Sequence, residues 1–496
     1  MVVAYHDYRL HVFGSGALPQ GKLEAAIASA DSLSNAVRAL ASAYYSAGYP
    51  AAQLTYALAN RDLYILVTLG RLAAVRGPRY LTKYFTDIHS DEPLTSSALE
   101  RRRTLASLHA DRAGENATPL LVRRGPGPTS PNVAPGYDDD DYLLDLKPDQ
   151  SGPKQTAVRA EVSNPGNRYV GRHFIDLDVK QNTGWGDEFH FLWRHSLTFL
   201  NHSNNGSNYA EYDLAWNRVT PYGVLGLAIM DTRYRIELEN LPLTGMLTSG
   251  EADWFGVLAA DFFSRWTLQA RLGRTDKRLD APAPSGPVQH ELYNWSELGS
   301  QYSIVHPLGQ QRLNLDAGIT LGAGLSPDER AVATDFRYFV WRPALHAQLQ
   351  ASASVTVALD ASAQLTHDTV PEQQQWVLGG LNNGGAYLPG VATGDAGEIV
   401  RGSLAYAAIP LGEHFRLTPK IFAEYGIAEL KHPSPGQNQG KPAIADAGVD
   451  LTLGAFEWLE LGLAYAEGFY DHDLTSDELQ ASRARLFFHV RGTFSF

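Results

Sequence analysis

The final stretch of the chain, residues 486–496, alternates strictly between two kinds of side chain. One face is apolar and carries Leu486, Phe488, Val490, Phe494 and the terminal Phe496. The other face is polar and carries Arg485, His489, Arg491, Thr493 and Ser495. A period of two predicts a β-strand with one face in an apolar medium and the other in a polar one. A strand of about ten residues spans a bilayer when it is tilted within a barrel.

The same alternation recurs from Thr156 onward, where helical spacing is absent. Four clear runs have their apolar positions at Ile175–Val179, Phe189–Trp193, Trp266–Leu272 and Leu313–Leu321. Roughly 340 residues at about ten per strand, with turns and loops, allow about sixteen strands. A tandem of soluble β-sandwiches is the alternative, but regular alternation of charged and aromatic residues favours lipid outside and water inside. We therefore expect residues 155–496 to form an antiparallel outer-membrane β-barrel, with Phe494 and Phe496 as its C-terminal strand signal.

Composition agrees with this interpretation. The net charge is −13, which argues against nucleic-acid binding because proteins that bind polyanions carry a basic surface. The chain has no cysteine, which excludes disulfides and cysteine-based metal or redox chemistry. No stretch approaches the roughly twenty apolar residues of a membrane helix. No signal peptide precedes Val2, so we expect the numbering to begin at a mature or engineered N-terminus.

Residues 1–76 predict a small α+β unit of order β-α-α-β-β. Tyr8–Phe13 alternates like a strand, and helical spacing follows through 23–27 and again over 32–47. Two further strands are expected at Leu54–Leu58 and Leu63–Leu69.

Residues 77–154 predict a second, less regular unit of the same kind. We expect an extended segment at Leu81–Ile88, a helix through 99–108, and strands at Leu120–Arg123 and Tyr142–Leu146. The intervening Pro- and Gly-rich stretch ends in Asp138–Asp141. A solvated hairpin loop is the preferred interpretation, and a calcium site is the alternative, although calcium ligands need spacing around the ion.

The sequence gives no positive sign of an enzyme. Neither an HExxH motif, a Walker-type phosphate loop nor a GxSxG elbow is present. His190 and His195 lie on opposite faces of one expected strand and are poor joint ligands. We predict no catalytic residue, metal or cofactor, and leave a barrel-resident hydrolase as an alternative because its residues could come from distant strands.

Two β-α-α-β-β units ahead of a barrel resemble the layout of the Omp85 superfamily, in which such units are called POTRA domains. The whole chain is most similar to the TpsB transporters of two-partner secretion, of the haemolysin-secretion type. The segments that carry the resemblance are Ala43–Tyr49, Ser163–Arg172, Leu378–Gly380, Thr393–Gly397 and Phe422–Gly426.

This resemblance implies that the barrel exports an unfolded partner exoprotein that the POTRA units bind in the periplasm by adding a strand to a sheet edge. It also implies contact with outer-membrane lipid and lipopolysaccharide, and assembly by the barrel-insertion machinery. The implied gating region is the sixth extracellular loop, with Gly379, Gly380, Asn383, Gly384, Gly385, Tyr387, Gly394, Asp395 and Gly397. A motif on the following strand would comprise Phe422 and Gly426.

Three departures qualify the resemblance. The family's loop-tip Val-Arg-Gly-Tyr should fall at Asn382–Tyr387, which contains no arginine. The acidic residue of the strand motif is Glu424 rather than aspartate. The plug helix that many members carry ahead of the first POTRA unit is missing from this numbering.

A local replacement for the missing arginine follows from the strand pattern. A hairpin with its turn around 411–414 sets Arg401 opposite Glu424 on the lumen side, within reach of a cross-strand ion pair. We hypothesise that this pair replaces the loop-to-strand lock. The alternative is that Arg401 is one of many solvated lumen charges.

Three other functions stay open. An Omp85-type assembly factor would insert other barrels or move lipid, but the amphipathic last strand favours a closed seam. A non-translocating anchor for a surface protein or filament is a second alternative, strengthened by the missing arginine. A diffusion porin would not need the first 150 residues.

Overall fold

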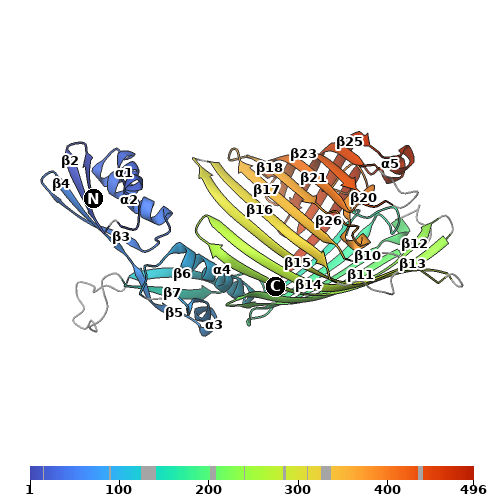
Figure 1. Ribbon diagram of the computed structural model, residues 1–496, viewed down its shortest axis with the longest axis horizontal. Helices are drawn as coiled ribbons and strands as arrows, with labels where there is room; N and C mark the ends of the chain where they lie inside the picture. The colour runs from blue at the N-terminus through green and yellow to red at the C-terminus, as the bar shows by residue number, and fades with distance from the viewer. Residues whose placement is uncertain are drawn as a thin grey trace.

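The structure, a computed structural model, describes residues 1–14, 16–88, 91–123, 141–200, 208–238, 241–282, 286–309, 311–325, 337–433 and 440–496. Two small sheets with helices lie at one end of a large barrel (Figure 1). Within these ranges, no helix is both long and apolar enough to cross a membrane.

The first sheet has the strand order β1-β2-β4-β3 and is covered on one face by two helices. Its elements are β1 (Val2–Tyr5), β2 (Tyr8–Phe13), α1 (Gln20–Ala28), α2 (Leu33–Ser46), β3 (Ala52–Ala59) and β4 (Asp62–Leu69). Leu10, Leu40 and Ile65 are fully buried between the sheet and the helices. The strand β1 was not expected, because its four residues VVAY show too few alternations for a period to be recognised.

The second sheet has the order β5-β7-β6. Its elements are β5 (Arg71–Arg76), α3 (Arg79–Thr82), the 3₁₀ turn η1 (Lys83–Phe85), α4 (Ser96–Arg112), β6 (Asn116–Arg123) and β7 (Asp141–Asp149). The strand β5 pairs in parallel with β7, so residues 71–76 lie in the second sheet although the expected boundary at 76 placed them in the first unit.

One element of this region was predicted wrongly. The segment expected to be extended, Leu81–Ile88, forms α3 and η1 instead. Leu81, Tyr84 and Phe85 are buried together, and their spacing of three and four residues is that of helical turns. The run Asp138–Asp140 lies outside the described residues, and Asp141 begins β7.

The barrel is closed and antiparallel, with 16 strands as expected, and β22 (Ile409–Pro410) is a short continuation of one of them. The strands are β8 (Thr156–Ser163), β9 (Phe174–Asn182), β10 (Asp187–Ser196), β11 (Asn208–Thr220), β12 (Gly223–Leu238), β13 (Leu241–Ala260), β14 (Ser264–Ala281), β15 (Gly286–Leu308), β16 (Gln311–Gly324), β17 (Phe339–Gln350), β18 (Val355–Gln364), β21 (Ala396–Tyr406), β23 (Phe415–Glu429), β24 (Ala443–Ala455), β25 (Leu459–His472) and β26 (Leu486–Ser495). Shorter elements between them are η2 (Thr198–Leu200), η3 (Glu372–Gln374), β19 (Trp376–Leu378), β20 (Ala392–Gly394) and α5 (Ser476–Ser482).

The last strand closes the barrel as predicted. Seven residue pairs join β26 to β8, from His489 opposite Ser163 to Ser495 opposite Ala157. On the lumen side, Arg491 Nε lies 2.8 Å from a carboxylate oxygen of Glu161, across the seam. Phe494 faces outward and stacks on Trp458 with ring centroids 5.4 Å apart, and the terminal Phe496 is exposed.

The two ends of the barrel differ. We call proximal the end that contacts the N-terminal sheets, and distal the end that carries α5 and the long segment 365–395. At the proximal end, Arg112 of α4 donates from Nη1 to the carbonyl of Gly186, at 2.8 Å. Tyr45 of α2 stacks on Phe262 in the β13–β14 turn, with centroids 4.5 Å apart. Both N-terminal units therefore contact barrel turns directly.

Candidate functional site in the barrel lumen

The segment 365–395, here called the lumen loop, leaves β18 and folds inward before it returns as β21. Inside the barrel it forms the two-stranded sheet of β19 and β20. Leu378, Ala386 and Tyr387 of the loop are buried against Ile444 and Ala466 of the barrel wall. The loop is therefore packed within the lumen and not extended into solvent.

Arg401 and Glu424 lie opposite each other on β21 and β23, as the hairpin argument predicted. Arg401 Nη1 is 3.1 Å from Glu424 Oε2, and their side chains are 9% and 1% exposed. The same nitrogen donates to the carbonyl of Leu381 in the loop at 2.7 Å, and the guanidinium lies 3.9 Å from the ring centroid of Phe422. Arg401 is thus a buried, paired charge, which contradicts the alternative of a solvated lumen charge.

Glu424 also holds the loop tip through its backbone. Its Oε1 accepts hydrogen bonds from the amides of Gly384, at 3.1 Å, and Gly385, at 2.6 Å. Gly384 has a φ of +117°, and a Cβ there would meet Ile444 at 2.4 Å, so only glycine fits this close approach. Hydrogen bonds to an ionised carboxylate are among the stronger ones in proteins.

Asp446 on β24 completes the arrangement and was missed by the sequence argument. It lies opposite Glu424 in register, is fully buried, and accepts the amide of Ala386 at Oδ2, 3.2 Å away. In the sequence, Asp446 could have been found as a charged residue that the strand alternation places on the lumen side, next to Glu424. One arginine and two carboxylates on three strands thus surround the loop tip.

The other predicted loop residues shape the loop and its base. Gly379 donates its amide to the carbonyl of Asn383 at 2.6 Å, and Gly380 donates to that of Tyr387 at 2.8 Å. The buried Asp395 accepts the amides of Val370, at 2.9 Å, and Lys431, at 2.8 Å. The remaining three glycines lie where a Cβ would meet a neighbour, namely the backbone of Glu429 at Gly394, the Trp376 side chain at Gly397 and the Leu378 side chain at Gly426.

A second set of contacts holds the start of the loop to a different part of the wall. Glu372 pairs with Lys277 of β14, and Gln374 accepts from Arg342 Nη2 of β17 at 2.6 Å. Gln364 donates to the backbone carbonyl of Gln374 at 2.8 Å. Because β14 and β24 lie on nearly opposite sides of the barrel, the lumen loop is tied to both sides.

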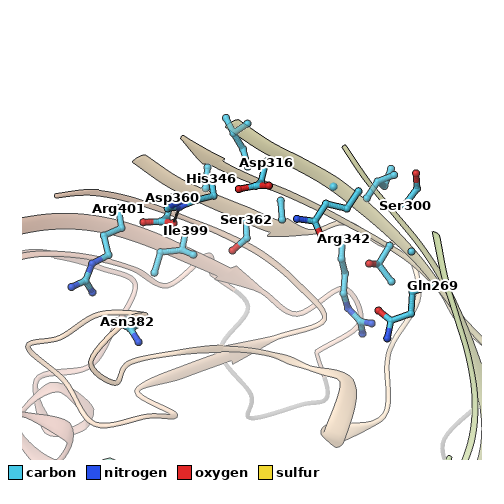
Figure 2. A pocket seen from close by; sticks show the side chains of 18 of the residues that line it. Gln269, Ser300, Asp316, Arg342, His346, Asp360, Ser362, Asn382, Ile399 and Arg401 are labelled. Atoms are coloured by element: carbon cyan, nitrogen blue, oxygen red, sulfur yellow. Dashed lines mark hydrogen bonds and ion pairs between the residues drawn. The ribbon is translucent and has the colours of Figure 1, made fainter. Parts of the chain in front are cut away.

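A cavity of about 610 Å³, lined by both polar and apolar side chains, remains between the lumen loop and the wall from β13 to β23 (Figure 2). The close-up shows Gln269, Asp316 and Arg342 on the wall side, with Asn382 of the loop below. His346 and Asp360 are hydrogen-bonded at 2.5 Å within it. Over the described ranges, no three histidine or acidic side chains gather into a possible metal site.

No protein-family model and no curated protein matches the sequence. Among solved structures, CdiB from Escherichia coli is similar with a TM-score of 0.71 at 14% sequence identity, covering 98% of this chain and 90% of that one. CdiB from Acinetobacter baumannii is similar with a TM-score of 0.65, also at 14% identity, covering 98% of this chain and 89% of the other. The chain therefore has the fold of CdiB over nearly its whole length, which confirms the expected fold of α+β units followed by a 16-stranded barrel.

Proposed function

We propose that this protein is an outer-membrane translocator of the TpsB type that exports an unfolded partner polypeptide through its barrel. The two units expected at residues 1–76 and 77–154 would be POTRA units in the periplasm, with the boundary between them before β5, because β5 pairs in the second sheet. Residues 155–496 would be the transmembrane barrel. The observation that carries the proposal is a free sheet edge without charges, in the same chain as a closed barrel whose lumen is polar.

The free edge is β3. Four strands form the outer edges of the two N-terminal sheets, namely β1, β3, β5 and β6. Proteins protect such edges with charges, proline or short length. The strand β1 has four residues, β5 begins and ends with arginine, and β6 contains Pro119. The sequence of β3, AQLTYALA, has neither a charge nor a proline over eight residues.

An unprotected edge of this length supports binding of an extended polypeptide by strand addition. Tyr56 and Leu58 of β3 are 61% and 55% exposed and would contact apolar side chains of the added strand. Backbone hydrogen bonds supply affinity without demanding one sequence, which suits a client that is still unfolded.

The lumen supports the second half of the proposal. Its wall carries paired charges such as Arg194 with Asp176 and Arg271 with Glu297, so that an extended chain could keep its backbone solvated. Among the residues described here, the lumen loop is the part of the chain that crosses this space. Export would then require the loop tip to leave Glu424 and Asp446.

Assembly of other barrels is the first competing function. It would be favoured by a weak seam, since a client strand must then enter between the first and last strands. The seven pairs between β26 and β8, with the Arg491–Glu161 pair across them, favour a seam that stays closed. A non-translocating anchor is the second competitor, and the loop held at both sides of the lumen favours it.

Quantitative mass spectrometry of the medium, cell surface and outer membrane, with and without the encoding gene, separates these functions. Loss of one large exoprotein from medium and surface, with other barrels unchanged, is the result expected for export. A broad fall in other barrels would instead indicate an assembly factor. No change in either would leave the anchor as the better account.

A further inference from the structure

The start of the lumen loop is held by a buried lysine that has two carboxyl groups within its surroundings. Lys277 of β14 pairs with Glu372 of η3, and their side chains are 3% and 54% exposed. In the register of β14 and β15, however, the residue directly opposite Lys277 is Glu291, which is 3% exposed. The barrel wall thus has a buried carboxyl group of its own beside the lysine, while the ion pair is made with the loop.

Glu291 is incompletely bonded. Its Oε1 accepts a hydrogen bond from the side-chain amide of Gln289 at 2.9 Å, whereas its Oε2 is buried and has no hydrogen-bond partner among the described residues. Lys277 acts on Glu291 electrostatically, but its ion pair is with Glu372. An unbonded buried carboxyl oxygen is unfavourable. A bond from Lys277 to Glu291 would therefore remove an unfavourable feature of the wall.

The geometry allows the lysine to change partner. Directly opposed residues of an antiparallel pair have Cβ atoms about 5 Å apart, and a lysine carries its ammonium group on a flexible four-carbon stem. The amide of Gln289 also lies 3.4 Å from Glu372 Oε2, so Glu291 and Glu372 lie on either side of one donor. A cavity of about 290 Å³ borders the loop at Gln373 and Gln374, which gives this segment room to move.

We propose that Lys277 is the cation of a two-position switch that holds or releases the start of the lumen loop. Paired with Glu372, the lysine holds η3 against β14. Paired with Glu291, it leaves Glu372 to the solvent and η3 is free to shift. The exchange replaces one ion pair by another, so the two positions differ little in free energy, as a switch requires. The switch needs only the lumen loop inside the barrel, so it is independent of export.

Two substitutions of equal size have opposite expected effects. Glu372→Gln removes the partner on the loop, so Lys277 moves to Glu291 and the released population should rise. Glu291→Gln removes the partner on the wall, so Lys277 stays with Glu372 and the released population should fall. Each change should be about tenfold, as expected when one charge-assisted hydrogen bond is lost. Carboxyl groups that only support the structure would both loosen the loop when they are replaced.

Single-channel recordings and spin-label distances in the purified full chain measure the released population. Labels at Gln373→Cys on the loop and Thr244→Cys on the outer face of β13 can be placed because the chain has no cysteine of its own. Glu372→Gln should add a second distance and raise the opening frequency, and Glu291→Gln should lower that frequency. Glu251→Gln is the matched control and should change neither, because its partner Arg271 keeps Glu297.

The Glu291 variant decides the outcome. More frequent openings in Glu291→Gln would show that this residue only supports the wall, and an unchanged frequency would show that it does not compete for the lysine. Either result overturns the switch. Glu291→Asp keeps the charge but withdraws it by one methylene group, so it should lower the frequency more weakly. It takes the place of Glu291→Gln if that variant loses the heat-modifiable migration of a folded barrel, and an unchanged or higher frequency in it overturns the switch equally.

Discussion

The guanidinium of Arg401 and the carboxylate of Glu424 form a buried ion pair of 3.1 Å between directly opposing positions of β21 and β23. Both partners also contact the lumen loop, Arg401 through the carbonyl of Leu381 and Glu424 through the amides of Gly384 and Gly385. The pair therefore joins the barrel wall to the loop as well as strand to strand. We hypothesise that it holds the loop in the place of the absent loop-tip arginine.

Glu424→Ala is expected to release the loop tip. The change leaves Arg401 buried without its counter-charge, which costs about 3–5 kcal/mol in a folded protein. Ion conductance in planar bilayers should therefore rise. The matched control is Asp450→Ala, which removes the partner of Lys420 across the neighbouring pair of strands, β23 and β24, where that lysine is 33% exposed. Such a solvated pair contributes about 0–1 kcal/mol to stability. Equal conductance of the two variants would contradict the hypothesis that the Arg401–Glu424 pair holds the loop.

Charge reversal tests the pair itself. Arg401→Glu alone and Glu424→Arg alone each place like charges together in a buried site and should open the loop. The double reversal restores the ion pair, but an arginine at 424 cannot accept the amides of Gly384 and Gly385. We therefore expect partial rescue in conductance, between the single variants and the unmodified chain. If the conductance of the double reversal were no closer to that of the unmodified chain than either single variant, the hypothesis that this ion pair holds the loop would be wrong.

Asp446→Ala should act in the same direction as Glu424→Ala but more weakly. Asp446 supplies one hydrogen bond to the loop, from the amide of Ala386 at 3.2 Å, whereas Glu424 supplies two and the ion pair. The expected cost is about 1–3 kcal/mol, that of leaving one buried donor unsatisfied. Conductance records of the two variants, compared under one voltage protocol, check this order. A larger effect at Asp446 would mean that the tip depends chiefly on β24.

Strand addition at the edge of β3 can be blocked by mutation without unfolding the first sheet. Tyr56→Lys/Leu58→Lys puts two charges on side chains that are already exposed, so stability should change by less than about 0.5 kcal/mol. Secretion of the client should fall steeply, because charges on an edge strand oppose strand addition. Leu120→Lys/Val122→Lys on β6 is the control, since Pro119 already interrupts that edge. Equal loss of secretion in both variants would contradict a role specific to β3.

The contact between α4 and the barrel is predicted to be acid-sensitive. Burial, with the nearby charge of Lys83 as the next cause, lowers the pKa of His109 from its ordinary value of 6.5 to about 4. Its ring packs on the β9–β10 turn, where a Cβ on Gly186 would lie 2.7 Å from Nδ1, and Tyr84 OH bonds the same nitrogen at 2.7 Å. When α4 is undocked, His109 binds a proton below about pH 6.5, whereas the docked side chain stays neutral down to about pH 4. Docking is therefore fully favourable above pH 6.5 and weakens as the pH falls toward 4.

Spin labels can follow this docking because the chain has no cysteine of its own. Labels at Arg103→Cys on α4 and Tyr222→Cys on a proximal turn should give one narrow distance at about pH 7.5 and a broader distribution at about pH 4.5. His109→Gln should remove most of this difference, while His11→Gln in the first sheet should not. A distribution that broadens equally in His109→Gln would assign the effect to other groups.

Much of the barrel could be predicted because each of its strands carries its own period of two. The last strand shows this best, since Val490 and Phe494 face outward and Arg491 faces the lumen as the alternation requires. The facing of Arg401 and Glu424 was also predictable, because a hairpin with a known turn fixes its register. Local pattern was sufficient for both.

The rest depends on contacts that a strand pattern does not contain. Asp446 and the backbone donors of Gly384 and Gly385 come together only once the lumen loop has folded inward, and no period describes that path. The burial of Arg401 has the same origin, because the loop covers it. The strand β1 and the helix α3 were missed since four residues are too few to establish a period.

Export as proposed requires a polypeptide to pass through the lumen beside the loop. A photo-crosslinking residue at Ser362, which lines the lumen cavity on β18, tests it most directly in secreting cells. The same residue at Val357, which faces outward on that strand, is the control. We expect adducts with one large secreted polypeptide from Ser362 and none from Val357. Adducts from neither position, in cells that still secrete the polypeptide, would contradict transport through this barrel.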